Sequence, residues 1–187
     1  MGTIIYLIRH SLVDYTEDPI KDKVIDLSPR GWEESVSIAD NWSDNNIRCI
    51  YTSPLNRCIE TLVPLALRLK IQYHVNDGLQ ELDYRGNAPA FHKNIKTDVG
   101  FHYEHGETLA QADERFQNTL LSICKKHNNE TVVISSHGTV MSQFLIKYLK
   151  FNDEYFYEMT YPDVYKLLYS PDNNEFTMLD RIIHKDI

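Results

Sequence analysis

The stretch Thr3-Ile-Ile-Tyr-Leu-Ile-Arg9-His10 carries the clearest fold signal in the sequence. Its apolar and β-branched residues follow one another without alternation, which is typical of a strand buried on both faces of a sheet. A second run of this kind lies at Thr131 to Ser136, and a third at Ile47 to Thr52. Helices cover both faces of sheets built from such strands, so the sequence predicts an α/β fold.

Helical patterns of ten or more residues separate these strands. We expect helices at about residues 30–42, 53–69, 107–127 and 139–150. Further strands are predicted at 71–75, 163–169 and 175–181, and irregular segments at 12–29 and 77–106. The alternation of strand and helix favours a mainly parallel central sheet with helices on both faces, formed by a single domain over residues 1–187.

Local signals sharpen the prediction for the first two helices. The second is expected to begin with Ser53 as N-cap and Pro54 at the first helical position. Pro64 lies in the middle of that helix, where a proline is expected to kink or break it. The apolar face predicted for the first helix consists of Val36, Ile38, Ala39 and Trp42.

The composition is that of an ordinary globular protein, with 42% hydrophobic and 25% charged residues. A net charge of -8 argues against nucleic acid or an anionic membrane as the main partner, but a few cations in a cleft can still bind a small anionic substrate. Cys49, Cys58 and Cys124 have no disulfide spacing and are expected to be free thiols in a reducing compartment. Because the apolar start at Thr3 to Ile8 is too short to span a bilayer, we expect a cytoplasmic protein.

Residue types that bind phosphate follow three of the predicted strands. Arg9-His10 ends the first strand, Ser53 to Arg57 follows the second, and Ser136-His137-Gly138 ends the strand at 131–136. Ligands of such sheets bind outside the carboxyl ends of the strands. We therefore expect the three groups to meet in one phosphate-binding site.

Several motifs of phosphoryl and acyl transfer are absent. The sequence has no Gly-x-x-x-x-Gly-Lys-Ser/Thr or Gly-x-Gly-x-x-Gly loop, no Asp-x-Asp pair and no Gly-x-Ser-x-Gly elbow. No cysteine has an arginine six positions later. His102 and His105 lack a carboxylate or cysteine that would complete a zinc set, so neither a metal nor another cofactor is predicted.

A neutral imidazole is the nucleophile that remains. The usual pKa of histidine leaves much of the side chain unprotonated near pH 7. Arg9 and Arg57 can each form forked bonds to phosphoryl oxygens, and His137 can donate a further hydrogen bond. Gly138 lets the backbone approach a phosphate at the start of the following helix.

A leaving alkoxide also needs a proton, which calls for a carboxylic acid in the site. Glu81, in the irregular segment after the third strand, is the candidate that we select, and Asp77 and Asp83 stay open as alternatives. The tyrosines expected to pack or to line the rim of the site are Tyr155, Tyr157 and Tyr161.

These residues resemble motifs of the histidine phosphatase superfamily, in its phosphoglycerate mutase-like branch. Leu7-Ile-Arg-His10 is similar to the Arg-His-Gly signature of that family. Tyr51-Thr-Ser-Pro-Leu-Asn-Arg-Cys-Ile-Glu-Thr61 is similar to its Ser-Pro-x-x-Arg-x-x-x-Thr helix start. Leu79-Gln-Glu-Leu-Asp-Tyr84 looks like the segment that carries its acidic residue.

The resemblance continues in the second half of the chain. Gly106-Glu-Thr108 with Arg115 matches the later helix of the family, and Val133-Ile-Ser-Ser-His-Gly138 matches its second histidine. The matches occur in the order of the family and cover nearly the whole chain. They imply a phosphoglycerate mutase-like fold and a metal-independent enzyme.

By this resemblance, His10 would be the phosphorylated nucleophile and Glu81 the proton donor. Arg9, Arg57 and His137 would hold the phosphoryl oxygens. The implied function is hydrolysis of a phosphomonoester, of a small phosphorylated metabolite, through a phosphohistidine on His10.

Residues around this set depart from the family pattern. Ser11-Leu12-Val13 stands where the family has Gly-Glu-Thr, and Thr16 replaces an asparagine. Arg85-Gly86-Asn87 stands in place of Gly-x-Trp-Glu-Gly. Since these positions belong to the rim that selects substrate, the sequence does not name the substrate.

Three other functions are alternatives: a phosphoglycerate-type mutase, a phosphoprotein phosphatase and a non-catalytic phosphate-binding module. A mutase must keep water away from its phosphohistidine, and the short stretch between Glu81 and Gly106 offers little cover. A module without activity would be expected to lose the nucleophile or an arginine, and both are present. Hydrolysis is the reading that we carry forward.

Overall fold

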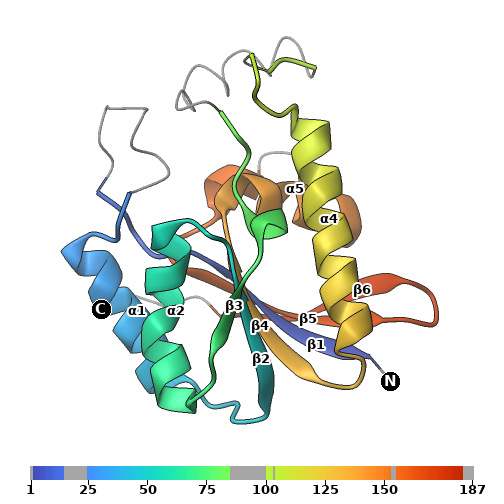
Figure 1. Ribbon diagram of the computed structural model, residues 1–187. Helices are drawn as coiled ribbons and strands as arrows, with labels where there is room; N and C mark the ends of the chain where they lie inside the picture. The colour runs from blue at the N-terminus through green and yellow to red at the C-terminus, as the bar shows by residue number, and fades with distance from the viewer. Residues whose placement is uncertain (1, 15–24, 85–99, 103, 153–154, 183–187) are drawn as a thin grey trace.

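The computed structural model describes residues 2–14, 25–84, 100–102, 104–152 and 155–182 (Figure 1). The strands are β1 (Thr3–Arg9), β2 (Ile47–Thr52), β3 (Tyr73–Val75), β4 (Thr131–Ser136), β5 (Asp163–Ser170) and β6 (Glu175–Ile182). The α-helices are α1 (Pro29–Asn41), α2 (Asn56–Leu69), α4 (Leu109–Lys126) and α5 (Gly138–Leu149). Short 3-10 turns are η2 (Asp77–Leu79) and η3 (Tyr155–Glu158).

The six strands form one sheet in the order β3-β2-β4-β1-β5-β6. The pairings from β3 to β1 are parallel, whereas β5 and β6 are added antiparallel. Only a short turn separates β5 from β6, and a connection of that length can join antiparallel strands alone. The predicted α/β fold with a mainly parallel sheet is confirmed, with an antiparallel end.

Side chains of β1 alternate between two hydrophobic cores. Ile5 and Leu7 belong to the core that α4 and α5 cover. Tyr6 and Ile8 belong to the core that α1 and α2 cover, and Figure 1 shows the two helix pairs on opposite faces of the sheet. Burial on both faces is the reason for the unbroken apolar run at the start of the sequence.

Helix α2 differs from the prediction at its start and at its middle. It begins at Asn56, and the Ser53 hydroxyl is bonded to the His137 ring and the Leu55 N–H instead of capping the helix. The helix also runs through Pro64 without a break. Burial of Leu62, Leu65 and Ala66 on either side of the proline offsets the one backbone hydrogen bond that it removes.

One apolar position of α1 and the length of one strand also differ from the prediction. Val36 is 45% exposed, although Ile38, Ala39 and Trp42 are buried as predicted. The inward face of α1 is instead completed by polar residues that contact the loop after β1. The predicted strand at 71–75 is shorter, because the Ile71 N–H bonds the Ala66 carbonyl as part of the end of α2.

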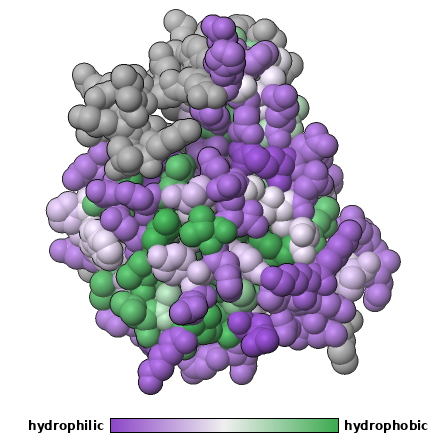
Figure 2. Space-filling model, in the orientation of Figure 1, coloured by the Kyte–Doolittle hydropathy of each residue, from purple (hydrophilic) through white to green (hydrophobic). Residues whose placement is uncertain are grey.

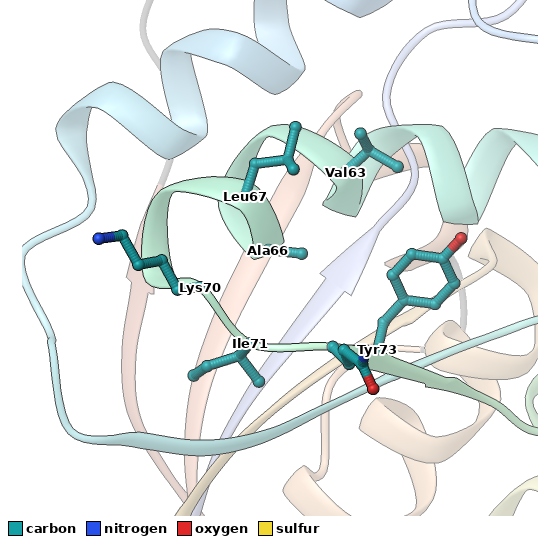
Figure 3. A pocket seen from close by; sticks show the side chains of 7 residues that line it. Val63, Ala66, Leu67, Lys70, Ile71 and Tyr73 are labelled. Atoms are coloured by element: carbon teal, nitrogen blue, oxygen red, sulfur yellow. The ribbon is translucent and has the colours of Figure 1, made fainter.

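A hollow of about 540 Å³ opens between the end of α2 and β3. Val63 and Leu67 border it from the helix, and Ile71 and Tyr73 from the segment that leads into β3 (Figure 3). Hydrophobic residues gather on this face in Figure 2. None of the predicted site residues lines this hollow.

Membrane insertion finds no support in the helices that the structure describes. None of them combines the length and the apolar character that crossing a bilayer requires.

Gly31 is required for the contact between α1 and the loop after β1. A Cβ atom there would lie 2.0 Å from the Leu12 carbonyl oxygen, which also accepts a hydrogen bond from the Ser28 N–H. Gly31→Ala should lower the free energy of unfolding by about 1–3 kcal/mol, because backbone must move to admit the methyl group. Urea denaturation measures this, with Asp40→Ala at an exposed position of α1 as the control; equal effects would contradict the prediction.

Candidate active site

The carboxyl ends of β2, β4 and β1 are neighbours in the sheet, and the predicted groups meet there. In the pairing of β1 with β4, Arg9 lies opposite Ser136. The next residue of each strand is a histidine, and the rings of His10 and His137 lie 5.3 Å apart between centroids. Ser53 follows β2 on the other side of β4, where its N–H bonds the Ser135 carbonyl. Strand order thus converts three separate sequence motifs into one cluster.

His10 is buried, and its hydrogen bond fixes which ring nitrogen carries the proton. Its Nδ1 lies 2.8 Å from the Ser11 carbonyl oxygen, which can only accept a hydrogen bond. The proton is therefore on Nδ1, and Nε2 keeps its lone pair. Burial, and then the charges of Arg57 and Arg9, hold the pKa of His10 well below its usual value. The ring is neutral and nucleophilic at neutral pH.

Arg9 is held between an aromatic ring and a glycine. Its guanidinium carbon lies 3.6 Å from the centroid of the Tyr161 ring, and its Nη1 donates to the Met159 carbonyl at 3.1 Å. A Cβ atom on Gly138 would come within 2.9 Å of the guanidinium group. Gly138 therefore makes room for Arg9, a role that the sequence did not indicate. The Arg9 Nε–H is buried without a hydrogen-bond acceptor among the described residues.

Arg57 is the second residue of α2 and is buried. Its charge lowers the pKa of both His10 and His137. Thr61, one turn further along the helix, donates to the Arg57 carbonyl at 2.7 Å and accepts from the Ser11 N–H at 2.9 Å. Thr61 thus ties the backbone after His10 to the backbone of Arg57, and only its place in the quoted motif could have drawn attention to it.

His137 is fully buried immediately before α5. Its Nε2 lies 2.7 Å from the Ser53 hydroxyl and 3.3 Å from the Cys58 sulfur. Burial, and then the charges of Arg57 and His10, hold its pKa well below the usual value. Ser53 is therefore an orienting partner of this ring, where the sequence predicted a helix cap.

Glu81 places its carboxylate at the start of α5. Oε2 accepts from the Thr139 N–H at 3.1 Å, and Oε1 accepts from the Leu82 N–H at 2.9 Å. Burial raises the pKa of Glu81 even though these hydrogen bonds and the charges of Arg57 and Arg9 lower it. A raised pKa suits a carboxyl group that gives and takes a proton near neutral pH.

The two alternative acids are placed less favourably. Asp77 is exposed at the start of η2. The backbone of Asp83 pairs with Glu107, through the Asp83 N–H to the Glu107 carboxylate and the Glu107 N–H to the Asp83 carbonyl. The charges of Arg57 and Arg9 both act on the pKa of Glu81.

The remaining predictions concern a metal site, residues of the rim and three tyrosines. In the part of the chain that the structure describes, no three histidine, cysteine or acidic side chains gather as a metal site. Thr16 and Arg85 lie outside the described residues. Tyr155 is buried and Tyr161 lies 5.5 Å from the His10 ring between centroids, whereas Tyr157 is 65% exposed.

Comparison with known proteins agrees with this arrangement. A family model described as the histidine phosphatase superfamily (branch 1) matches residues 5–181. The chain is 27% identical to phosphoserine phosphatase 1 from Hydrogenobacter thermophilus over 128 residues. That match covers 62% of this chain and 61% of the relative, which is less than two thirds of the relative's length.

Two solved structures share the fold. A phosphoserine phosphatase from Entamoeba histolytica, in complex with 3-phosphoglyceric acid, is 19% identical with a TM-score of 0.76, and the match covers 98% of each chain. A mycobacterial glucosyl-3-phosphoglycerate phosphatase is 17% identical with a TM-score of 0.75, and the match covers 96% of this chain and 98% of the other. The phosphoglycerate mutase-like fold is thereby confirmed.

The two buried imidazoles should make the stability of the protein depend on pH. Their pKa values in the folded protein lie well below the usual 6.5, so only the unfolded chain binds protons there as the pH falls. The free energy of unfolding should therefore fall between about pH 7.5 and 5.5, by up to about 1.4 kcal/mol for each histidine. Urea denaturation of His10→Gln at both pH values should show a smaller loss. His74→Gln, at an exposed position of β3, is the control, and an unchanged loss in His10→Gln would contradict the prediction.

Proposed function

Because this chain belongs to the histidine phosphatase superfamily, we propose that it hydrolyses a phosphomonoester through a phosphohistidine formed on His10. The observation that carries the proposal is the state of His10. Its Nδ1 is bonded to the Ser11 carbonyl and its pKa is depressed, so an unprotonated Nε2 is available beside two guanidinium groups. That combination is what nucleophilic attack on a phosphate dianion requires.

Phosphorylation of the enzyme is the first step. The Nε2 lone pair of His10 attacks phosphorus, an N–P bond forms, and the P–O bond to the leaving group breaks. Glu81 gives its proton to the departing oxygen and becomes a carboxylate. Burial that raises the pKa of Glu81 supports this role, because the group must hold a proton before it can give it.

Water then releases the phosphate. The Glu81 carboxylate takes a proton from a water molecule while the oxygen of that water attacks phosphorus. The N–P bond breaks, and Nε2 of His10 recovers its lone pair. Inorganic phosphate leaves and the protonated Glu81 is restored. The proposal thus needs one group that changes protonation state twice in each cycle.

Fixed positive charge and hydrogen-bond donors stabilise the phosphoryl group in both steps. We assign the charge to Arg9 and Arg57 and a hydrogen bond to the neutral His137, with Gly138 giving Arg9 its space. Arg9 brings a buried Nε–H that lacks an acceptor among the described residues, and a phosphoryl oxygen would supply one. Two guanidinium groups offset the charge of a phosphate, so the proposed chemistry needs no metal.

We propose a small phosphorylated metabolite as the substrate. The curated relative is named a phosphoserine phosphatase, and the two solved structures are named as phosphatases of small phosphorylated compounds. Phosphoserine and 3-phosphoglycerate are therefore the first compounds to test.

All three cysteines are buried and free, which supports the proposed reducing, cytoplasmic compartment. The two cores that flank a single sheet support one domain over residues 1–187.

Removing the nucleophile tests the proposed function directly. His10→Ala should lower hydrolysis of phosphoserine and of an activated aryl phosphate by about 10⁴-fold or more, because the variant lacks the imidazole that forms the proposed intermediate. The assay is run in a chelator, with circular dichroism to verify folding and His74→Ala as the control. A folded variant that keeps substantial activity would exclude His10 as the nucleophile, and loss of wild-type activity in the chelator would exclude metal independence.

Replacing the acid should affect substrates according to their leaving group. Glu81→Gln should slow phosphorylation by an alkyl phosphate by about 10²–10⁴-fold, because an alkoxide must be protonated as it leaves. An activated aryl phosphate releases a weakly basic phenolate and should be affected far less. Single-turnover bursts on both substrates measure this. Equal losses on the two would transfer the role to Asp77 or Asp83.

A further inference from the structure

We propose that Glu107, just before α4, and Arg115, in the second turn of α4, are positioning residues that hold the Glu81 carboxyl group in place for proton transfer. The inference rests on the proposed function of Glu81. It concerns two side chains that take no part in the reaction themselves, and it follows from where their hydrogen bonds go.

The segment that carries Glu81 has little structure of its own. Glu81 lies after η2 and outside any helix or strand. Within the segment, the Gln80 N–H bonds the Asp77 carbonyl and the Tyr84 N–H bonds the Leu82 carbonyl. Neither bond involves the backbone of Glu81. A catalytic group needs its backbone fixed as well as its carboxyl end, so the hold on Glu81 must come from elsewhere in the fold.

Arg115 supplies that hold through its guanidinium group. Nη1 donates to the Gly78 and Gln80 carbonyls, both at 3.0 Å, and Nη2 donates to the Glu81 carbonyl at 3.3 Å. The remaining two donors bind the Glu107 carboxylate, at 2.8 Å from Nε and 2.7 Å from Nη2. All five N–H bonds of the guanidinium group are thus engaged.

Glu107 and Arg115 together form a clamp on this segment, in which Glu107 binds the part of the chain that follows Glu81. Its Oε2 also accepts from the Asp83 N–H at 3.3 Å, and its own N–H donates to the Asp83 carbonyl at 3.4 Å. The pair therefore binds the chain both before and after Glu81. At its other end, the Glu81 carboxylate is held by the Thr139 N–H at the start of α5.

The geometry points to positioning because both members of the pair are directed at backbone and at each other. The two side chains are about a quarter exposed, at 24% for Arg115 and 27% for Glu107. A flat fork of five donors is needed to reach three carbonyls and a carboxylate at once, and lysine has only three donors on one atom. Arg115→Lys should therefore release the segment while keeping the charge.

The test measures single-turnover phosphorylation by an alkyl phosphate and by an activated aryl phosphate, in Arg115→Lys and Glu107→Gln. A displaced acid costs rate only where the leaving group needs a proton. We expect losses of about 10–10²-fold on the alkyl phosphate and less than about threefold on the aryl phosphate. Adding Arg115→Lys to Glu81→Gln should cost little more than Glu81→Gln alone, because the proton donor that Arg115 positions is already lost.

Lys147→Gln is the matched control, since Lys147 of α5 forms an ion pair with Asp113 of α4, the helix that carries Arg115, and it should leave both rates unchanged. Equal losses on the two substrates, full additivity with Glu81→Gln, or failure of both variants to fold would overturn the proposal by making the pair purely structural. Wild-type enzyme and Glu81→Gln are measured alongside. If Glu81→Gln shows no dependence on the leaving group, the proposed role of Glu81 fails, and that result is distinct from a failure of the clamp alone.

Discussion

Burial of the Arg9 and Arg57 guanidinium groups beside two imidazole rings is the constraint on which the site depends. Cations taken out of water are costly unless other groups compensate them. Here the two imidazoles carry no charge, because burial and the two arginines together keep both His10 and His137 neutral. The same positive charge that disfavours protonation favours an incoming anion, so one arrangement both keeps an imidazole unprotonated and attracts the phosphoryl group of the proposed reaction.

The remainder of the fold keeps this arrangement in place through atoms that never meet the substrate. Arg9 is fixed by the Met159 carbonyl, the Tyr161 ring and the space at Gly138. Thr61 ties the loop after His10 to the first turn of α2. The antiparallel end of the sheet contributes to this, because Asp163, the first residue of β5, lies opposite Arg9. The segment just before β5 carries Met159 and Tyr161, which contact Arg9. Precision in the site is thus distributed over several elements.

Glu81 shows a second balance, between burial and hydrogen bonding. The N–H groups at the start of α5 favour the carboxylate, and burial favours the protonated acid more strongly. An acid that gives and then recovers a proton, as proposed for Glu81, is served by such opposing effects. Its carboxylate binds the Thr139 N–H at the start of α5, two residues along the chain from His137.

The sequence by itself determined the parallel strands, their helices and the residues of the central cluster. The signals for β1, β2 and β4 are local. An unbroken apolar run indicates a strand that is buried on both faces, and the polar residues after it mark the end of that strand. Arg9, His10 and His137 could be selected because each adjoins such a run. Tertiary structure alone decided what depends on atoms from distant segments. The hydroxyl of Ser53 binds His137 instead of capping α2, packing carries that helix through Pro64, and Arg115 holds the chain at Glu81. In each case a local conformational preference competes with an interaction to a residue that folding brings near. The sequence indicates only the local preference.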